Sequence, residues 1–183
     1  IDLSNADNLQ DILKIISKDH KDISVIVNNA GMTQDSLVFR MNNENWSKVI
    51  QTNLNSNYQI IKSLLPNMLA NKYGKIIGIS SIVGSTGNPG QSNYVASKSG
   101  MVGLYKSIAL EVAKRNINVN IISPGFISTS MTDNLQDEQK ETYLSRIPMS
   151  RFGKPEDVAN LVYFLSTDDS SYITGQNFHI NGG

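Results

Sequence analysis

Short runs of isoleucine and valine alternate along this chain with longer segments whose apolar residues recur at helical spacing. The runs lie at Ile23–Val27, Lys75–Ile79, Asn118–Ile122 and Phe178–Ile180. Strands that carry valine and isoleucine on both faces are typical of parallel sheets covered on each side. The alternation therefore predicts a doubly wound α/β fold with a parallel sheet. The length of 183 residues fits one domain, residues 1–183.

The helices of this fold are predicted from apolar residues that recur every three or four positions. They span about 5–18, 44–70, 93–115 and 155–165. Pro155 suits the first turn of the last helix, where no backbone N–H is needed. Residues 80–92 are expected to form a glycine-punctuated loop, and residues 126–152 a loop with one short helix.

Composition excludes several classes of function. The chain has no cysteine, which rules out disulfides, thiolate nucleophiles and cysteine-ligated metals, and its two histidines lie far apart in the sequence, so we expect no metal site. Lys+Arg 16 balances Asp+Glu 16, so no overall field favours nucleic acid or anionic membranes. No apolar run approaches the roughly 20 residues that span a bilayer. We expect a soluble protein that binds small molecules or a docked partner.

Three turns follow three different predicted strands at their carboxyl ends. They are Asn28–Gly31, Ser80–Ser81 and Pro124–Gly125. In doubly wound sheets, ligands bind just beyond the carboxyl ends of the strands. These turns are therefore expected to converge on one cleft.

Tyr94 and Lys98 lie four residues apart in a predicted helix, so their side chains share one face about 6 Å apart. A nearby ammonium favours the phenolate and is expected to lower the pKa of Tyr94 from about 10. A tyrosine with a lowered pKa is suited to general acid or base catalysis. The same spacing also fits an ordinary surface pair.

Two further polar residues stand out by position. Ser81 ends a strand, where its hydroxyl can donate to a substrate carbonyl or simply to local backbone. Asn53 lies in a predicted helix close to an apolar stripe, as does Asn57. A buried amide side chain must find hydrogen-bond partners. The alternative for Asn53 is an exposed polar position.

These elements, in this order and at these spacings, resemble the short-chain dehydrogenase/reductase family over essentially the whole chain. The stretches that carry the resemblance are Val27–Thr33, Gly90–Lys98, Ser123–Ile127 and Ile173–Gly183. Within the family they are most similar to the branch that reduces 3-oxoacyl groups on acyl carrier protein in type II fatty-acid synthesis. The resemblance implies a Rossmann-like fold and an NADP-dependent oxidoreductase.

The resemblance also implies a role for each catalytic residue. Tyr94 protonates the forming alkoxide as hydride arrives from NADPH, and Ser81 polarises the substrate carbonyl. Lys98 holds the nicotinamide-ribose hydroxyls and lowers the pKa of Tyr94. Asn53 fixes a water that links this lysine to solvent.

The cofactor and partner contacts follow from the same resemblance. Asn29 borders the adenosine, Asp2 and Leu3 the adenine, and Ile127 and Thr129 the carboxamide. The implied cofactor-binding set is Asp2, Leu3, Asn29, Ala30, Gly31, Tyr94, Lys98, Pro124, Gly125, Ile127 and Thr129. Lys72 and Arg115 fall where the related reductases dock the acidic acyl carrier protein.

The family opens with a glycine-rich turn that binds the cofactor pyrophosphate, and these 183 residues contain no such turn. We therefore expect about 55 further residues, two βα units and a strand, to precede Ile1. Without a neighbour on that side, Ile23–Val27 is expected to be an apolar edge strand. NADPH rather than NADH is implied by resemblance alone.

The resemblance further implies a cytoplasmic homotetramer. The expected subunit faces are the helix Trp46–Met68 and a second helix, which contributes Met101, Leu104, Tyr105, Ile108 and Val112. Residues 126–152 are expected to form a substrate lid or an amphipathic helix packed on the core, with Phe126, Met131, Leu135, Met149 and Phe152 as its apolar residues.

Two alternatives for function remain open. The same chemistry could act on acetoacetyl-CoA, a sugar or a steroid alcohol. A cofactor-free interaction module would use the same sheet without catalysis.

Overall fold

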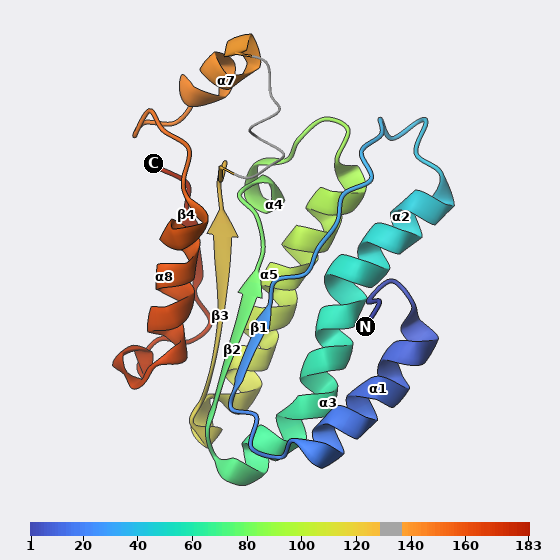
Figure 1. Ribbon diagram of the computed structural model, residues 1–183, viewed down its shortest axis with the longest axis vertical. Helices are drawn as coiled ribbons and strands as arrows, with labels where there is room; N and C mark the ends of the chain where they lie inside the picture. Colours follow the sequence, from blue (N-terminus) through green and yellow to red (C-terminus); the bar gives the residue numbers. More distant parts are fainter. Residues whose placement is uncertain (129–136) are drawn as a thin grey trace.

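In the part of the chain that the structure describes, four parallel strands form one sheet in chain order, β1-β2-β3-β4 (Figure 1). The computed structural model describes residues 1–128 and 137–183. The strands are β1 (Val25–Asn28), β2 (Gly74–Ile79), β3 (Ile117–Pro124) and β4 (Asn177–Ile180). Ile76 of β2 lies between Ile26 of β1 and Val119 of β3 in the register. The predicted α/β fold class is confirmed.

Helices cover both faces of this sheet (Figure 1). On one face lie α3 (Ser56–Asn71) and α5 (Ser92–Val112), with α1 (Ala6–Asp19) packed on α3. On the other face α8 (Pro155–Ser166) packs across β2 and β3. The remaining elements among the described residues are α2 (Asn43–Ile50), η1 (Gln51–Asn55), α4 (Val83–Thr86), η2 (Ala113–Arg115), α7 (Asp137–Leu144) and η3 (Asp168–Ser170).

The core lies on both sides of β2 and β3. Ile76 is buried against α3 and α5, whereas its neighbour Ile77 is buried towards α8. This two-residue alternation is the period of a strand, and burying one such isoleucine contributes about 1.5–3 kcal/mol. Burial on both faces explains why the strands are rich in isoleucine and valine.

β1 is an edge strand of the described sheet, as expected. Ile26 is buried against the helices, but Val25 and Val27 point to the α8 side and are 39% and 42% exposed. Because α8 packs on β2 and β3, this face of β1 is left uncovered.

The helix predicted over 44–70 contains a π-helical turn. α2 passes into η1 and then into α3, and the backbone N–H of Ser56 donates to the carbonyl of Gln51, five residues earlier. The Ser56 hydroxyl donates to the carbonyl of Thr52 at 2.6 Å. Side chains that bond carbonyls four residues back loosen the α-helical ladder, and π-turns often lie at functional sites.

Two expectations need correction. Residues 83–86, predicted as loop, form the short helix α4. Tyr105 and three neighbours on α5 were expected on a subunit face, but they are buried in the core of this chain: Met101, Tyr105, Ile108 and Val112. The part of the apolar surface of α5 that these four residues form is used by the core, whereas Leu104 is only partly buried. Among the described helices, none has the length and apolarity to cross a membrane.

Candidate active site

Ser81, Tyr94 and Lys98 line one cavity of about 360 Å³ at the carboxyl ends of the strands. Ser81 follows β2, and Tyr94 and Lys98 lie in the first two turns of α5. The turns at Asn29–Gly31 and Pro124–Gly125 complete the lining. The three strand-end turns therefore converge on one cleft. Figure 1 shows this end of the sheet beside α4.

Tyr94 is half-buried, and burial of the phenol raises its pKa above 10. A hydrogen bond with the Ser81 side chain works in the opposite direction, and the charge of Asp35 adds to the rise. The expected lowering of the pKa by Lys98 is wrong for this structure, because desolvation outweighs the other effects. Tyr94 is therefore protonated at neutral pH and can donate its proton.

Lys98 is only 3% exposed, and its Nζ donates to the carbonyl of Ile79 at 2.7 Å. Burial lowers its pKa to about 8, so the ammonium is charged at pH 7. An ammonium has three donors, and Ile79 is its only hydrogen-bond acceptor among the described residues. The remaining donors are available to hydroxyl groups of a ligand in the cleft.

Asn53 is fully buried in the π-helical turn. Its Oδ1 accepts from the backbone N–H of Met32, and its Nδ2 donates to the Met32 carbonyl, both at 2.9 Å. Nδ2 also lies 3.1 Å from Ser97 Oγ, which donates to the carbonyl of Tyr94 at 2.7 Å. Asn53 thus ties the turn after β1 to the helix that bears Tyr94 and Lys98.

A second cavity of about 690 Å³ adjoins the first, since both are lined by Asn29, Ile79 and Pro124. Ile127 and apolar residues of α8 form its other walls. Among the predicted cofactor-binding residues, the two cavities bring together Asn29, Gly31, Tyr94, Lys98, Pro124, Gly125 and Ile127, and Ala30 lies in the same turn.

The remaining predicted residues lie elsewhere. Asp2 accepts hydrogen bonds from the N–H and hydroxyl of Ser4, which hold the pKa of its carboxyl below the usual value, and neither Asp2 nor Leu3 lines the two joined cavities. Lys72 and Arg115 immediately precede β2 and β3, at the opposite end of the sheet from Tyr94. Thr129, Met131 and Leu135 lie outside the described residues.

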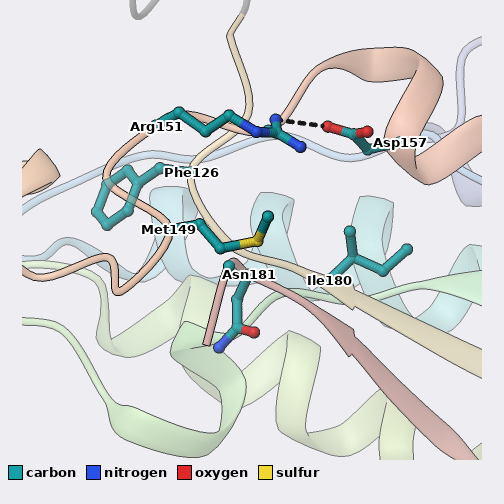
Figure 2. Close-up of a pocket in the computed structure, with 8 residues that line it drawn as sticks. Phe126, Met149, Arg151, Asp157, Ile180 and Asn181 are labelled. Carbon is teal, nitrogen blue, oxygen red and sulfur yellow. Dashed lines mark hydrogen bonds and ion pairs between the residues drawn. The ribbon is translucent and has the colours of Figure 1, made fainter.

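Two of the apolar residues predicted for the lid line a separate cavity of about 290 Å³ (Figure 2). Phe126 and Met149 line it, and the Phe126 ring lies 6.3 Å from that of Phe152. Figure 2 shows the ion pair between Arg151 Nη1 and Asp157 Oδ2, which are 3.0 Å apart. This pair joins the residue Arg151, just before α8, to the first turn of α8.

A nicotinamide cofactor fits the joined cavities. The buried Lys98 ammonium has donors left for ribose hydroxyls, and the Asn29–Gly31 turn allows close approach. A Cβ built on Gly31 would lie 3.4 Å from Lys98 Nζ and 3.5 Å from Asn53 Oδ1, so a side chain there would crowd both polar groups. No group of three histidine or acidic side chains gathers as a metal site within the part of the chain that the structure describes.

Comparison with known proteins assigns the family. A family model described as "Enoyl-(Acyl carrier protein) reductase" matches residues 1–183. Two curated relatives named "3-oxoacyl-[acyl-carrier-protein] reductase FabG", from Haemophilus influenzae and Rickettsia felis, are each 49% identical over the whole chain and 76% of their own length. The protein of that name from Staphylococcus aureus is 48% identical over 99% of this chain and 74% of its own length. The chain therefore belongs to the short-chain dehydrogenase/reductase family.

Proposed function

We propose that this protein reduces 3-oxoacyl groups on acyl carrier protein to 3-hydroxyacyl groups in fatty-acid synthesis, with NADPH as the reductant and in the cytoplasm. The observation that carries the proposal is the pair of hydroxyls, Ser81 and Tyr94, that meet in one cleft beside the buried ammonium of Lys98. The names of the relatives, at 48–49% identity, support the substrate class.

The hydride that reduces the carbonyl carbon would come from NADPH when it is bound. Tyr94 donates its phenolic proton to the carbonyl oxygen, which becomes the hydroxyl of the product. Ser81 donates a hydrogen bond to the same oxygen and so stabilises the charge that develops there. A general acid in this position contributes about 10²–10⁴-fold, and the raised pKa of Tyr94 keeps its proton in place until the oxygen becomes basic.

Lys98 acts on both the cofactor and the acid. Its Nζ lies 5.6 Å from the centre of the Tyr94 ring, so its charge stabilises the phenolate that remains after proton transfer. Its other donors would bind the ribose hydroxyls of the cofactor. Asn53 would hold a water between this lysine and solvent, which returns a proton to Tyr94.

Assembly as a homotetramer is part of the proposal. α3 and α5 form an apolar groove of about 280 Å³ whose walls include Leu65, Leu69 and Leu104. Leu110, which lies on α5, is 86% exposed. Apolar surface of this kind is typical of subunit interfaces, and a two-fold axis places the same residues on both partners.

This pairing also suits docking of the carrier protein. α5 extends for about 30 Å, from Tyr94 at the cleft towards Arg115 at the far end of the sheet. An antiparallel arrangement of two α5 helices would bring Lys72 and Arg115 of one subunit beside the cleft of the other. There the basic side chains would attract the acidic carrier.

An assay of the full-length protein with purified acyl carrier protein tests the substrate. NADPH oxidation is measured with a 3-oxoacyl and a 2-enoyl group on the same carrier, and with acetoacetyl-CoA. The enoyl arm is included because the matching family model is described as an enoyl reductase. We expect rapid oxidation with the 3-oxoacyl carrier and none above background with the enoyl carrier. Faster turnover of the enoyl carrier contradicts the proposal.

A charge reversal tests the docking site. In the double variant Lys72→Glu with Arg115→Glu, KM for the carrier-bound substrate should rise about tenfold, because each lost ion-pair partner costs roughly 0.2–1 kcal/mol. KM for a small 3-oxoacyl thioester should not change. Lys18→Glu with Lys21→Glu, two exposed lysines near the end of α1, is the matched control. Equal KM changes in both double variants would refute a specific docking site.

A further inference from the structure

Tyr105 buries its hydroxyl completely within the core of α5 and the sheet. Its side chain is 0% exposed, yet the oxygen has two polar partners. Asn28 Nδ2 donates to this oxygen at 2.7 Å, and the hydroxyl donates to Asn57 Oδ1 at 2.7 Å. A buried hydroxyl is costly unless it is bonded in this way. Three polar side chains thus form one continuous chain through an apolar region.

This polar chain ends at the candidate active site on both sides. Asn57 Nδ2 donates to the backbone carbonyl of Asn53 at 2.9 Å, inside the π-helical turn. At the other end, Asn28 directly precedes Asn29, which lines both cofactor cavities. The hydroxyl of Tyr105 therefore connects the carboxyl end of β1 with the turn that presents the Asn53 side chain.

Gly78 makes the space that Tyr105 occupies. A Cβ added to Gly78 would lie 2.6 Å from Cε1 and Cζ of the Tyr105 ring, closer than side-chain atoms approach in proteins. This glycine is in the interior of β2, where glycine weakens a strand. This loss of strand stability is offset by Tyr105, whose ring fills the space and whose hydroxyl donates to Asn57.

We propose that Tyr105 and Asn57 are positioning residues of the site, which fix the Asn53 carbonyl in the π-helical turn and thereby aim the Asn53 amide at Met32 and Ser97. Neither residue lines the catalytic cleft, so both act through Asn53. The inference deepens the proposed reductase function and rests on it. Because Ser97 in turn bonds the carbonyl of Tyr94, displacement of Asn53 is transmitted to the helix that bears the acid.

Two substitutions test the proposal in the full-length protein. Tyr105→Phe removes only the hydroxyl, and Asn57→Val removes the donor to Asn53. We expect each to lower kcat about three- to thirtyfold, the range found for residues that act through a network. KM for the 3-oxoacyl thioester and the dissociation constant of NADPH should change less than about twofold, because neither residue touches a ligand.

The double variant distinguishes positioning from general damage. If Tyr105 acts only through Asn57, Tyr105→Phe combined with Asn57→Val should have the same kcat as Asn57→Val alone. Independent structural effects would multiply instead. The comparison is made well below the melting temperature of each variant, so that all samples are folded.

Tyr73→Phe is the matched control, since its hydroxyl donates to Asp168 Oδ1 at the opposite end of the sheet. It should leave kcat unchanged. A kcat of Tyr105→Phe equal to wild type, or multiplicative losses in the double variant, would overturn the inference. If the wild-type protein does not reduce a 3-oxoacyl thioester, the proposed function itself is wrong. The two failures are therefore distinguishable.

Discussion

At the scale of single residues, burial shifts the pKa values of Tyr94 and Lys98 in opposite directions within one cleft. It raises the pKa of Tyr94 and lowers that of Lys98 to about 8. At pH 7 the phenol is neutral and the amine is charged. In the proposed mechanism, Tyr94 carries the proton that carbonyl reduction consumes, and the Lys98 cation lies beside the phenolate that proton transfer would leave. Reductase activity should fall as the pH rises above 8, where Lys98 loses its charge.

The stability of the protein should report the burial of Lys98. Its pKa is about 8 when folded and 10.5 when exposed, so the unfolded chain binds more protons between these values. Stability relative to Lys98→Met should therefore rise with pH from 8 to 10.5, by up to about 3 kcal/mol. Below pH 8 the difference should be constant. Urea unfolding of both variants across this range measures it, and a pH-independent difference would contradict the assigned burial.

The sequence predicts the candidate residues better than it predicts their ionisation. The Tyr94 and Lys98 spacing, Ser81 at a strand end and the polar Asn53 on an apolar stripe all led to residues that lie in or beside the cleft. The pKa of Tyr94 was predicted in the wrong direction, because spacing reveals a charge nearby but does not reveal how much water burial removes. Tyr105 fits the apolar stripe of its helix, so periodicity gave no sign of its polar partners.

At the scale of elements, the sequence predicts strands and long helices because their apolar periods are clear. The π-helical turn at Gln51–Asn55 could not be predicted. A π-turn holds one residue more than an α-helical turn, and this does not change the amino-acid composition of the segment. α4 was missed because it is only four residues long and contains Gly84. Both features lie beside the cleft, where local structure departs from the regular pattern.

The fit between β2 and α5 can be tested at Gly78. Gly78→Ala should destabilise the protein by about 1–3 kcal/mol, because the added methyl overlaps the Tyr105 ring and overpacking of a core costs this much. Gly103→Ala is the control in α5, where an added Cβ meets nothing within 4 Å. That change should stabilise the helix by about 0.5–1 kcal/mol. Thermal unfolding gives both values, and equal effects would contradict the packing described.

At the scale of the whole molecule, our proposal assigns different functions to the two ends of the sheet. The carboxyl end holds the cleft, whereas Lys72 and Arg115 lie at the amino end. A carrier docked at Lys72 and Arg115 would lie at the end of the sheet opposite the cleft of the same chain. The proposed tetramer resolves this separation, and it depends on the groove between α3 and α5.

Leu104 tests the assembly. Leu104→Asp places a charge in the groove and should dissociate the tetramer, because an unpaired charge at the centre of an interface is costly. Ile15→Asp, at a 60% exposed apolar position on α1, should leave the assembly intact. Light scattering at micromolar concentration measures the mass. A wild-type monomer under these conditions would contradict the proposed interface.

The most direct test of the account is the turnover number of Tyr94→Phe in the full-length protein with a 3-oxoacyl thioester and NADPH. Phenylalanine keeps the ring and removes the proton donor, so kcat should fall at least about 10²-fold. Tyr172→Phe, at a fully exposed position before β4 that lines neither of the two joined cavities, should keep wild-type turnover. A folded Tyr94→Phe protein that reduces the substrate as fast as wild type would show that this cleft does not supply the proton.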